Sequence, residues 1–342
     1  MKFFGLSINR YLAFRLGGSF LALHLLVAPA EGENHLKKVR LAYSGWEVGT
    51  AIAYVGIDGG IFKKYDLEVE EVFIRDTFSA GIQSLMGVDF LIGFGNPLAI
   101  LQPTLAGADI VSLGAHEIME RYSMGVSPGI SAIKDLKGKK IGVSVIGGRS
   151  DLVSRVILRR AGLDPVKDVE IVSAGLGPHR VAALAKNLIQ GAPLPPEIAD
   201  KAKELGIKVI EVKEVPLTTA MLMTTRSFIK KDEEAVRRFI KGYVAAIHFY
   251  LTRRDQSIAI MRKYFSGTDP AALENMYHAF AAQLKPLPAP SREAVQALID
   301  VASVIDAKSK NIKPADLFEP RFLEELKANK FLDDLYAEKV SL

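Results

Sequence analysis

Residues 135–151 carry the strongest chemical signal in the sequence, because an expected buried strand, residues 141–145, is followed by two glycines and then by a helix. At such a junction, free backbone N–H groups point at whatever lies above the edge of the sheet. Gly147 and Gly148 have no side chains, so a ligand can approach the backbone closely. Arg149 adds a guanidinium group that suits a carboxylate, sulfonate or phosphate. The segment predicts the capture of a small ligand.

Ser150 and Asp151 stand at the start of the helix that follows, which we expect over residues 150–161. Both side chains are typical of helix caps, and Ser150 is also a candidate ligand contact. Asp151 could instead hold Arg149 in place. For Arg149 two interpretations stay open: a clamp on an anionic ligand, or a loop arginine that faces solvent.

The elements that must position this segment follow a regular order in a chain of 342 residues, which is long enough for about two domains. Hydrophobic residues make up 49% and charged residues 24%, as in ordinary globular proteins. Strands alternate with helices in the first part, which predicts a mostly parallel sheet. The strands are expected at residues 39–43, 67–72, 90–94 and 109–113, and the helices at 51–57, at 78–86 and from Asn96 and Pro97 onward.

A second α/β unit is expected after Tyr122, because the same alternation starts again. Its strands are expected at residues 140–145, 169–172, 189–194 and 207–212, and its helices at 150–161, 180–188 and 196–205. From residue 232 onward only helices are expected: one at 232–251, one started by Asp269 and Pro270, and one capped by Ser291 that runs to residue 305. Helices without a third sheet predict packing onto an existing lobe.

The first 30 residues have the pattern of a secretory signal peptide. Lys2, Arg10 and Arg15 precede an apolar stretch at residues 17–27, and small residues before and at Ala30 suit a cleavage site. An uncleaved anchor helix would need about 20 apolar residues, and the two arginines interrupt that length. We therefore predict export with cleavage near Ala30.

The charge and the absence of cysteine narrow the class of protein further. Residues 1–30 hold three of the 44 Lys and Arg and none of the 39 Asp and Glu, so the rest carries a net charge of only +2. Such a balance argues against a nucleic-acid partner. With no cysteine there is no disulfide, thiolate metal site, cysteine nucleophile or lipid anchor on a cysteine. These features favour a bacterial periplasm.

Residues 59–70, Gly-Gly-Ile-Phe-Lys-Lys-Tyr-Asp-Leu-Glu-Val-Glu, closely resemble the GIFKKYGLEVE-like signature of exported ABC-transporter solute-binding proteins. The branch includes nitrate-, sulfonate/taurine- and thiamine-pyrimidine-binding proteins. Further weak motifs follow in the family's order, at residues 127–130, 162–165, 194–196, 224–229 and 311–314. Their order and spacing together carry the resemblance, which covers about residues 39–325.

The resemblance implies an α/β, two-lobed clamshell like type II periplasmic binding proteins, with two mixed sheets flanked by helices and C-terminal helices packed on lobe one. Lobe one would combine residues 37–125 with 221–342, and lobe two would be residues 126–220. The chain would cross near residues 122–128 and 215–225. A ligand would bind between the lobes, and the closed monomer would dock on an ABC permease in the inner membrane, with no cofactor.

Some residues depart from the family pattern. Gln190 stands where an acidic residue is common, and Pro193 stands where a β-former is usual, so the end of that strand is expected to be bent or short. Trp46 and Glu47 replace small polar residues near the first strand. These differences bear on the ligand and not on the fold.

The candidate ligand-binding residues come from both units. They are Ser44, Gly45, Trp46, Thr50, Asn96, His116, Gly148, Arg149, Ser150 and Leu194. Each has a structural alternative: Trp46 packs under a loop, Thr50 and Asn96 cap helices, and His116, expected just after a strand that finishes at Gly114, is a satisfied structural residue. Residues 178–180, Pro-His-Arg, are a further source of positive charge at a helix start.

No catalytic arrangement is found in the sequence, and we predict neither an enzyme nor a metal site. His116 and Glu117 form the only adjacent pair of a histidine and an acid, and no Gly-x-Ser-x-Gly elbow or phosphate-binding lysine loop occurs. The leading hypothesis is a solute-binding protein for ABC import of a small organic molecule, for example an organic anion. One alternative is an enzyme of pyrimidine-precursor synthesis on the same fold, although those fungal relatives are cytosolic and carry a cysteine-rich motif. Another is a sensor that passes its ligand state to a membrane receptor.

Overall fold

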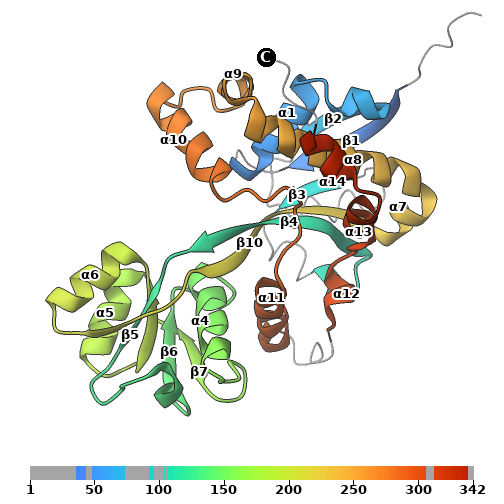
Figure 1. The fold of residues 1–342 in the computed structure, drawn as a ribbon. Coiled ribbons are helices and arrows are strands. Elements are labelled where there is room, and N and C mark those ends of the chain that lie inside the picture. Colours follow the sequence, from blue (N-terminus) through green and yellow to red (C-terminus); the bar gives the residue numbers. More distant parts are fainter. Residues whose placement is uncertain are drawn as a thin grey trace, which may run out of the picture. The chain divides into compact units, whose positions relative to one another are not determined.

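The computed structural model describes residues 36–43, 48–73, 92–95, 103–104, 106–305 and 312–337, all within one compact unit that spans Leu36–Leu342. Its strands form two five-stranded sheets, with orders β2-β1-β3-β10-β4 and β7-β6-β8-β5-β9 (Figure 1). Both sheets are mixed and carry helices, so the expected two-lobed α/β fold class is confirmed. The predicted signal peptide and the expected helix at residues 78–86 lie outside the described residues.

The first sheet combines three parallel strands with a long antiparallel pair. Its strands are β1 (Lys37–Tyr43), β2 (Leu67–Phe73), β3 (Ile92–Gly95), β4 (Ile110–Glu120) and β10 (Val215–Thr225). β4 and β10 pair along their whole length, from Val215 opposite Glu120 to Thr225 opposite Ile110. The expected strand at 109–113 is therefore too short, and the expectation that residues 207–212 form the last strand is wrong. Pairing with a partner so distant in the chain leaves no local signal.

The second sheet confirms four strands close to their expected places. Its members are β5 (Ser123–Val126), β6 (Lys140–Val143), β7 (Glu170–Ser173), β8 (Gly191–Leu194) and β9 (Lys208–Glu211). β6 is parallel to β7 and β8, whereas β5 is antiparallel to β8 and β9. β8 pairs with β6 only at Gly191, opposite Ile141. This short pairing agrees with the expected effect of Pro193, which has no N–H to donate.

The chain passes between the sheets twice. It leaves the first sheet after Glu120 and enters the second at Ser123, and it returns between Glu211 and Val215. In Figure 1, β4 and β10 run side by side from the first sheet toward the body that holds β5 and β6. Double crossings of this kind are typical of hinged two-lobed proteins. The boundaries of the lobes in residue numbers stay a prediction.

The helices surround both sheets. They are α1 (Ala51–Asp58), α4 (Arg149–Arg160), α5 (Gly177–Ala185), α6 (Pro196–Glu204), α7 (Arg226–Lys231), α8 (Glu233–Thr252), α9 (Arg254–Tyr264), α10 (Pro270–Ala281), α11 (Arg292–Ile305), α12 (Pro314–Leu317), α13 (Arg321–Ala328) and α14 (Phe331–Ala337), with 3₁₀ turns at Val48–Thr50, Phe62–Tyr65 and Ile133–Leu136. Asp269 caps α10 as expected, and the Ser291 hydroxyl accepts the Ala294 N–H at the start of α11.

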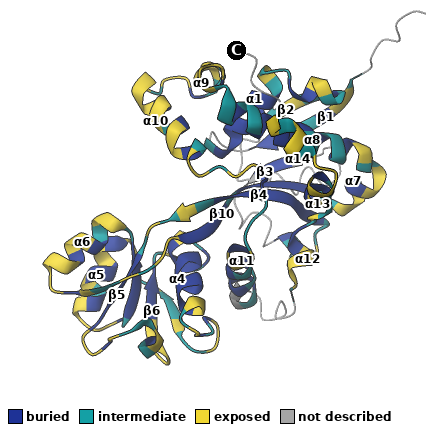
Figure 2. Cartoon of the chain, viewed as in Figure 1, coloured by how far each residue is buried: buried dark blue, intermediate teal, exposed yellow. Residues whose placement is uncertain are grey.

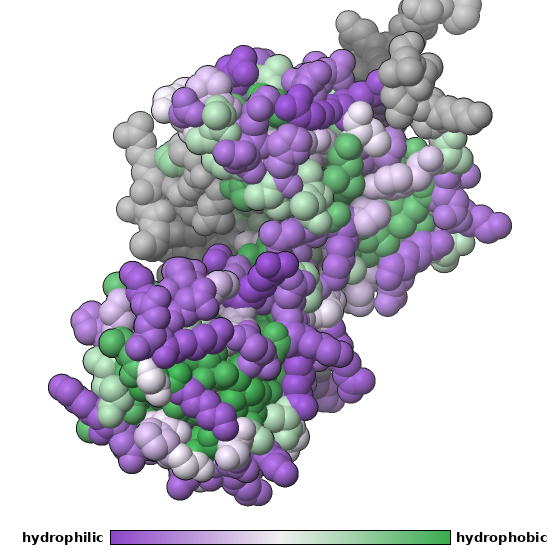
Figure 3. All heavy atoms as spheres, turned by 60° about the vertical axis from the view of Figure 1, so that its left-hand side comes forward, coloured by the Kyte–Doolittle hydropathy of each residue, from purple (hydrophilic) through white to green (hydrophobic). Residues whose placement is uncertain are grey.

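Most residues of the strands, and residues along the helices that pack on them, are buried (Figure 2). α8 packs with α1 and the 3₁₀ turn at Phe62–Tyr65 in the largest core, which lies with the first sheet. α11 differs from the other C-terminal helices, because it packs on α4 and β10. Asp300 of α11 accepts the Nε–H of Arg159 on α4 at 2.7 Å. The space-filling view shows a mostly hydrophilic surface, with hydrophobic side chains gathered on the second-sheet body at the bottom (Figure 3).

Candidate functional site

Three helices begin at one edge of the second sheet, which we call the carboxyl edge. α4 follows β6, α5 follows β7 and α6 follows β8. Because these three strands are parallel, their carboxyl ends and the helix N-termini after them lie at the same edge. In open α/β sheets, ligands bind outside the carboxyl ends of the strands. The carboxyl edge is therefore the candidate functional site.

The glycine pair forms a tight turn at this edge, between β6 and α4. Gly147 has φ of +79°, which favours glycine, and the Gly148 N–H donates to the Val145 carbonyl at 3.0 Å. A Cβ on Gly148 would lie 2.8 Å from Val145 Cγ1, so a side chain there would displace the turn. α4 has no side-chain cap, and no described residue accepts the backbone N–H of Arg149 or Ser150. These two donors remain for a ligand.

The turn is held from below by side chains whose roles differ from those expected. Ser150 does not cap α4: its Oγ accepts the Ser144 N–H at 2.8 Å and lies 2.8 Å from Ser144 Oγ. Asp151 does not hold Arg149. Its Oδ2 accepts the Gly147 N–H at 2.7 Å, and its Oδ1 lies 2.8 Å from Nε of Arg155. Both side chains of the Asp151–Arg155 pair are buried, at 0% and 1% exposed. Because Asp151 also accepts the Gly147 N–H, this buried pair fixes the geometry of the glycine turn.

Arg149 is more exposed than a buried anion clamp would be. Its side chain is 61% exposed and its Nη1 lies 3.0 Å from Oε1 of Glu120, the last residue of β4. The ion pair thus joins the start of α4 to the end of a first-sheet strand. An exposed pair of this type contributes little to stability.

Tyr122 and Arg180 lie at the same edge; the sequence indicated Arg180 only as part of the positively charged segment at residues 178–180, and it did not indicate Tyr122. Arg180, in the first turn of α5, is only 4% exposed, and its Nη1 donates to the Pro193 carbonyl at 2.7 Å. Its Nε has no hydrogen-bond partner among the described residues, and burial lowers the pKa of the guanidinium. Burial raises the pKa of the Tyr122 hydroxyl, an effect that Glu120 adds to and the positive charges of Arg149 and Arg180 oppose. The only sequence signal for Arg180 was its place at a helix start; Tyr122 gave none, because its position depends on the crossing.

The remaining candidates are buried or lie outside the described residues. Ser44, Gly45, Trp46 and Asn96 lie outside the described residues. Thr50 precedes α1 and is buried, and its side chain does not cap the helix. The Leu194 side chain is buried in the core of the second sheet, against Gly125. Their ligand contacts stay predictions.

His116 lies inside β4 and not after its end, because the strand continues to Glu120. It is 3% exposed, and its Nε2 lies 2.7 Å from the hydroxyl of Tyr243. Burial lowers the pKa of this imidazole to about 3, so the ring is neutral at physiological pH. Its described contacts are those of the structural alternative, and a ligand role for His116 stays a prediction.

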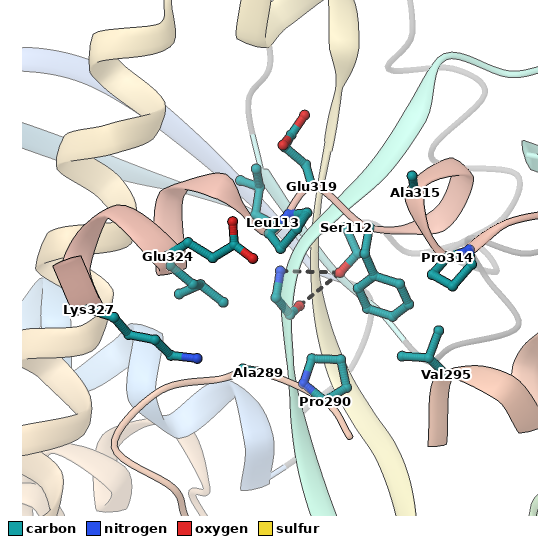
Figure 4. Close-up of a pocket in the computed structure, with 14 residues that line it drawn as sticks. Ser112, Leu113, Ala289, Pro290, Val295, Pro314, Ala315, Glu319, Glu324 and Lys327 are labelled. Carbon is teal, nitrogen blue, oxygen red and sulfur yellow. Dashed lines mark hydrogen bonds between the residues drawn. The ribbon is translucent and has the colours of Figure 1, made fainter. Parts of the chain in front are cut away.

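A separate, apolar pocket of about 430 Å³ opens beside β4. Figure 4 shows Glu324 and Lys327 of α13 on one side and Pro314 and Ala315 of α12 on the other. At its floor, the Ser112 hydroxyl is already hydrogen-bonded within the protein, because the Gly114 and Leu222 carbonyls both lie within hydrogen-bond distance to accept its proton. The pocket offers a mainly apolar wall, whereas the carboxyl edge offers unsatisfied donors.

Comparison with known proteins agrees with this architecture. Residues 48–257, more than half of the chain, match the model of a family described as NMT1/THI5 like. A protein of Brucella abortus (strain 2308), whose name calls it a candidate binding protein, is 27% identical over 265 residues, which cover 74% of this chain and 79% of the relative. A similarly named protein of Bacillus subtilis (strain 168) is 25% identical over 298 residues, covering 81% of this chain and 85% of the relative.

Two solved structures are similar in fold. A periplasmic sulfonate-binding protein from Methylobacillus flagellatus KT matches with a TM-score of 0.53 and 18% identity, covering 86% of this chain and 96% of that one. The periplasmic aliphatic sulphonate binding protein of Escherichia coli matches with a TM-score of 0.50 and 16% identity, covering 83% and 92%. At such identities the likeness shows the fold.

Proposed function

Because the chain belongs to the NMT1/THI5-like family, we propose that it is an exported solute-binding protein, which captures a small organic ligand and delivers it to an ABC import permease. The relatives named as binding proteins, and the sulfonate-binding proteins that share the fold, support this function. The proposed ligand is a sulfonate, a carboxylate or a pyrimidine-like compound.

The observation that carries the proposal is the unsatisfied carboxyl edge of the second sheet. The backbone N–H groups of Arg149 and Ser150 have no acceptor among the described residues, and the glycine turn before them leaves the backbone accessible. A ligand oxygen would complete these hydrogen bonds. The two chain crossings would allow the sheets to close on the ligand by a hinge motion, which changes the surface presented to a permease.

Binding without chemistry is the simpler reading of the described residues. The buried histidine His116 is neutral and engaged with Tyr243, which does not suit a general base that exchanges protons with solvent. Asp151, the buried carboxylate next to the glycine turn, is neutralised by Arg155. Neither group is arranged to activate a nucleophile.

The periplasm is the proposed location, and it depends on the signal peptide predicted at residues 1–30. The similar sulfonate-binding proteins are themselves periplasmic. Within the described parts of the chain, no helix combines the length and the apolar character needed to cross a membrane.

A ligand screen with two readouts tests the proposal. Calorimetric titration of the purified protein with sulfonates, nitrate, aromatic carboxylates and pyrimidines would identify a ligand, and small-angle scattering would record whether the molecule becomes more compact with it. Product formation in the same mixtures would favour the enzyme alternative. Loss of uptake of that ligand on deletion of the gene would separate transport from sensing, because a pure sensor leaves uptake itself in place.

A further inference from the structure

We propose that Arg180, together with the hydroxyl of Tyr122, binds the anionic group of the ligand, and that Arg149 does not. This inference rests on the proposed function, since it assigns a residue of the same site. It differs from one of the two sequence-based interpretations of Arg149, that of a clamp on an anionic ligand.

The first argument is the unbalanced charge of Arg180. Its side chain is 4% exposed, and no described carboxylate lies within ion-pair distance of it. One guanidinium nitrogen donates to the Pro193 carbonyl, and Nε finds no partner in the part of the chain that the structure describes. Arg155 is similarly buried but is neutralised by Asp151. A buried charge without a counter-charge is costly to keep, and an anionic ligand would supply both the charge and the missing acceptor.

The second argument is the place of Arg180 at the carboxyl edge. The backbone carbonyl of Pro193 can accept a hydrogen bond from the guanidinium, because β8 pairs with β6 only at Gly191. This holds the guanidinium at the carboxyl end of β8, next to the crossing where Tyr122 lies. Ser123, the residue after Tyr122, pairs with Leu194, the residue after Pro193, so Tyr122 lies at the same end of β8 as the Arg180 guanidinium.

Tyr122 suits the role of a second donor. No described residue takes a hydrogen bond from its hydroxyl, and its raised pKa keeps the hydroxyl protonated. A protonated phenol donates to an anion without adding charge. The nearby Glu197 is exposed to solvent, and Glu120 is already paired with Arg149, so neither neutralises Arg180.

Arg149 is the weaker choice for the same anion. It is 61% exposed and would have to leave Glu120 to bind a ligand. Two apolar side chains also lie exposed at this edge: Val145 at 57% and Leu176 at 69%. Val145 follows β6, just before the glycine turn, and Leu176 follows β7, just before α5. An apolar tail on the anion would cover them, which favours an alkyl or aryl acid over an inorganic anion.

The test compares variants of the full-length protein by calorimetric titration with hexanesulfonate, hexanoate and uncharged hexanamide. We expect wild type to bind an anionic probe better than the amide. Arg180→Gln should weaken that binding by about tenfold or more, and Tyr122→Phe by about threefold to tenfold, because each removes a hydrogen bond to a charged group. Arg180→Lys should restore part of the loss. Arg121→Gln, an exposed neighbour paired with Glu214, is the matched control and should bind as wild type does.

Thermal unfolding without ligand separates a ligand role from a structural one. If Arg180 serves the ligand, Arg180→Gln should unfold at the same or a higher temperature than wild type, because it removes an uncompensated buried charge. Anion binding retained in Arg180→Gln but lost in Arg149→Gln would overturn the inference and leave the proposed function standing. Preference of wild type for hexanamide would overturn it in the same way. No binding of any probe, or of any compound in the wider screen, would contradict the proposed function as well.

Discussion

The buried Asp151–Arg155 pair is expected to be among the most sensitive points of the structure. Arg155→Met removes the positive charge but keeps a side chain of similar length. It leaves the Asp151 carboxylate, which is 0% exposed, with the Gly147 N–H as a donor and without a counter-charge. Breaking a buried pair from one side costs about 3–5 kcal/mol. Asp151→Asn should cost a similar amount, because it leaves Arg155 uncompensated.

The double variant Asp151→Asn/Arg155→Met gives the matched comparison. It removes both charges, and the amide oxygen of asparagine can still accept the Gly147 N–H. We therefore expect it to cost only about 1–2 kcal/mol, less than either single variant, since the desolvation of both ions is also removed.

Urea unfolding followed by circular dichroism measures these costs. With a slope of about 3 kcal/mol per M urea, the midpoint of Arg155→Met should fall by roughly 1 to 1.7 M. A loss of less than about 1 kcal/mol in Arg155→Met, or single-variant costs that simply add in the double variant, would refute the reasoning. Either result would mean that the two charges are not coupled as their burial indicates.

Three further predictions concern His116, Gly148 and Asp300. His116 has a pKa of about 3 when folded against 6.5 ordinarily, so the unfolded chain binds the extra proton and stability falls as pH drops below 6.5. The loss of stability should be about 2 kcal/mol by pH 5. The urea midpoint of His116→Gln should therefore change less with pH than that of wild type, and an equal pH dependence in the two proteins would contradict this. Gly148→Ala places a Cβ 2.8 Å from Val145 Cγ1 and should weaken ligand binding by about tenfold in calorimetry; unchanged affinity would show that the turn does not shape the site. Asp300→Asn weakens the 2.7 Å contact with Arg159 and should cost about 1–3 kcal/mol in urea unfolding, whereas an unchanged midpoint would mean that this contact does not hold α11 on α4.

Much of the fold was predictable because its signals are local. The alternation of short apolar runs with helical patterns placed the described strands of residues 37–73 and 140–211 within a few residues, and Asp269 before Pro270 marked the start of α10. The family resemblance supplied the double crossing. These features depend on residues close in sequence or on a motif order that one chain can show.

The missed elements depend on long-range pairing. β10 and the second half of β4 are strands because they pair with each other, from Val215 opposite Glu120 onward, although the segments are far apart in sequence. The helix α11 was predicted at its place, but its packing on α4 through Arg159 and Asp300 also depends on residues far apart in the sequence. No pattern within these segments indicates which distant segment each one contacts.

The turn at the candidate site was predicted in place, but the contacts around it were not. The glycine turn before α4 was located correctly, yet the side chains of Ser150 and Asp151 make other contacts than expected. The Asp151–Arg155 pair had a readable signal, since an acid and a base stand four residues apart on one helix face. Arg180 had a weaker one, because its burial and its contact with Pro193 arise only when α5 packs on the end of β8.

Amide hydrogen exchange, with and without the ligand identified by the screen, is the most direct test of where this protein binds. Binding at the carboxyl edge predicts slower exchange at residues 144–151 and 176–180, since the free donors at the start of α4 become hydrogen-bonded and the ligand covers the start of α5. Unchanged exchange at these residues, with protection appearing instead around the pocket beside α12 and α13, would contradict the account.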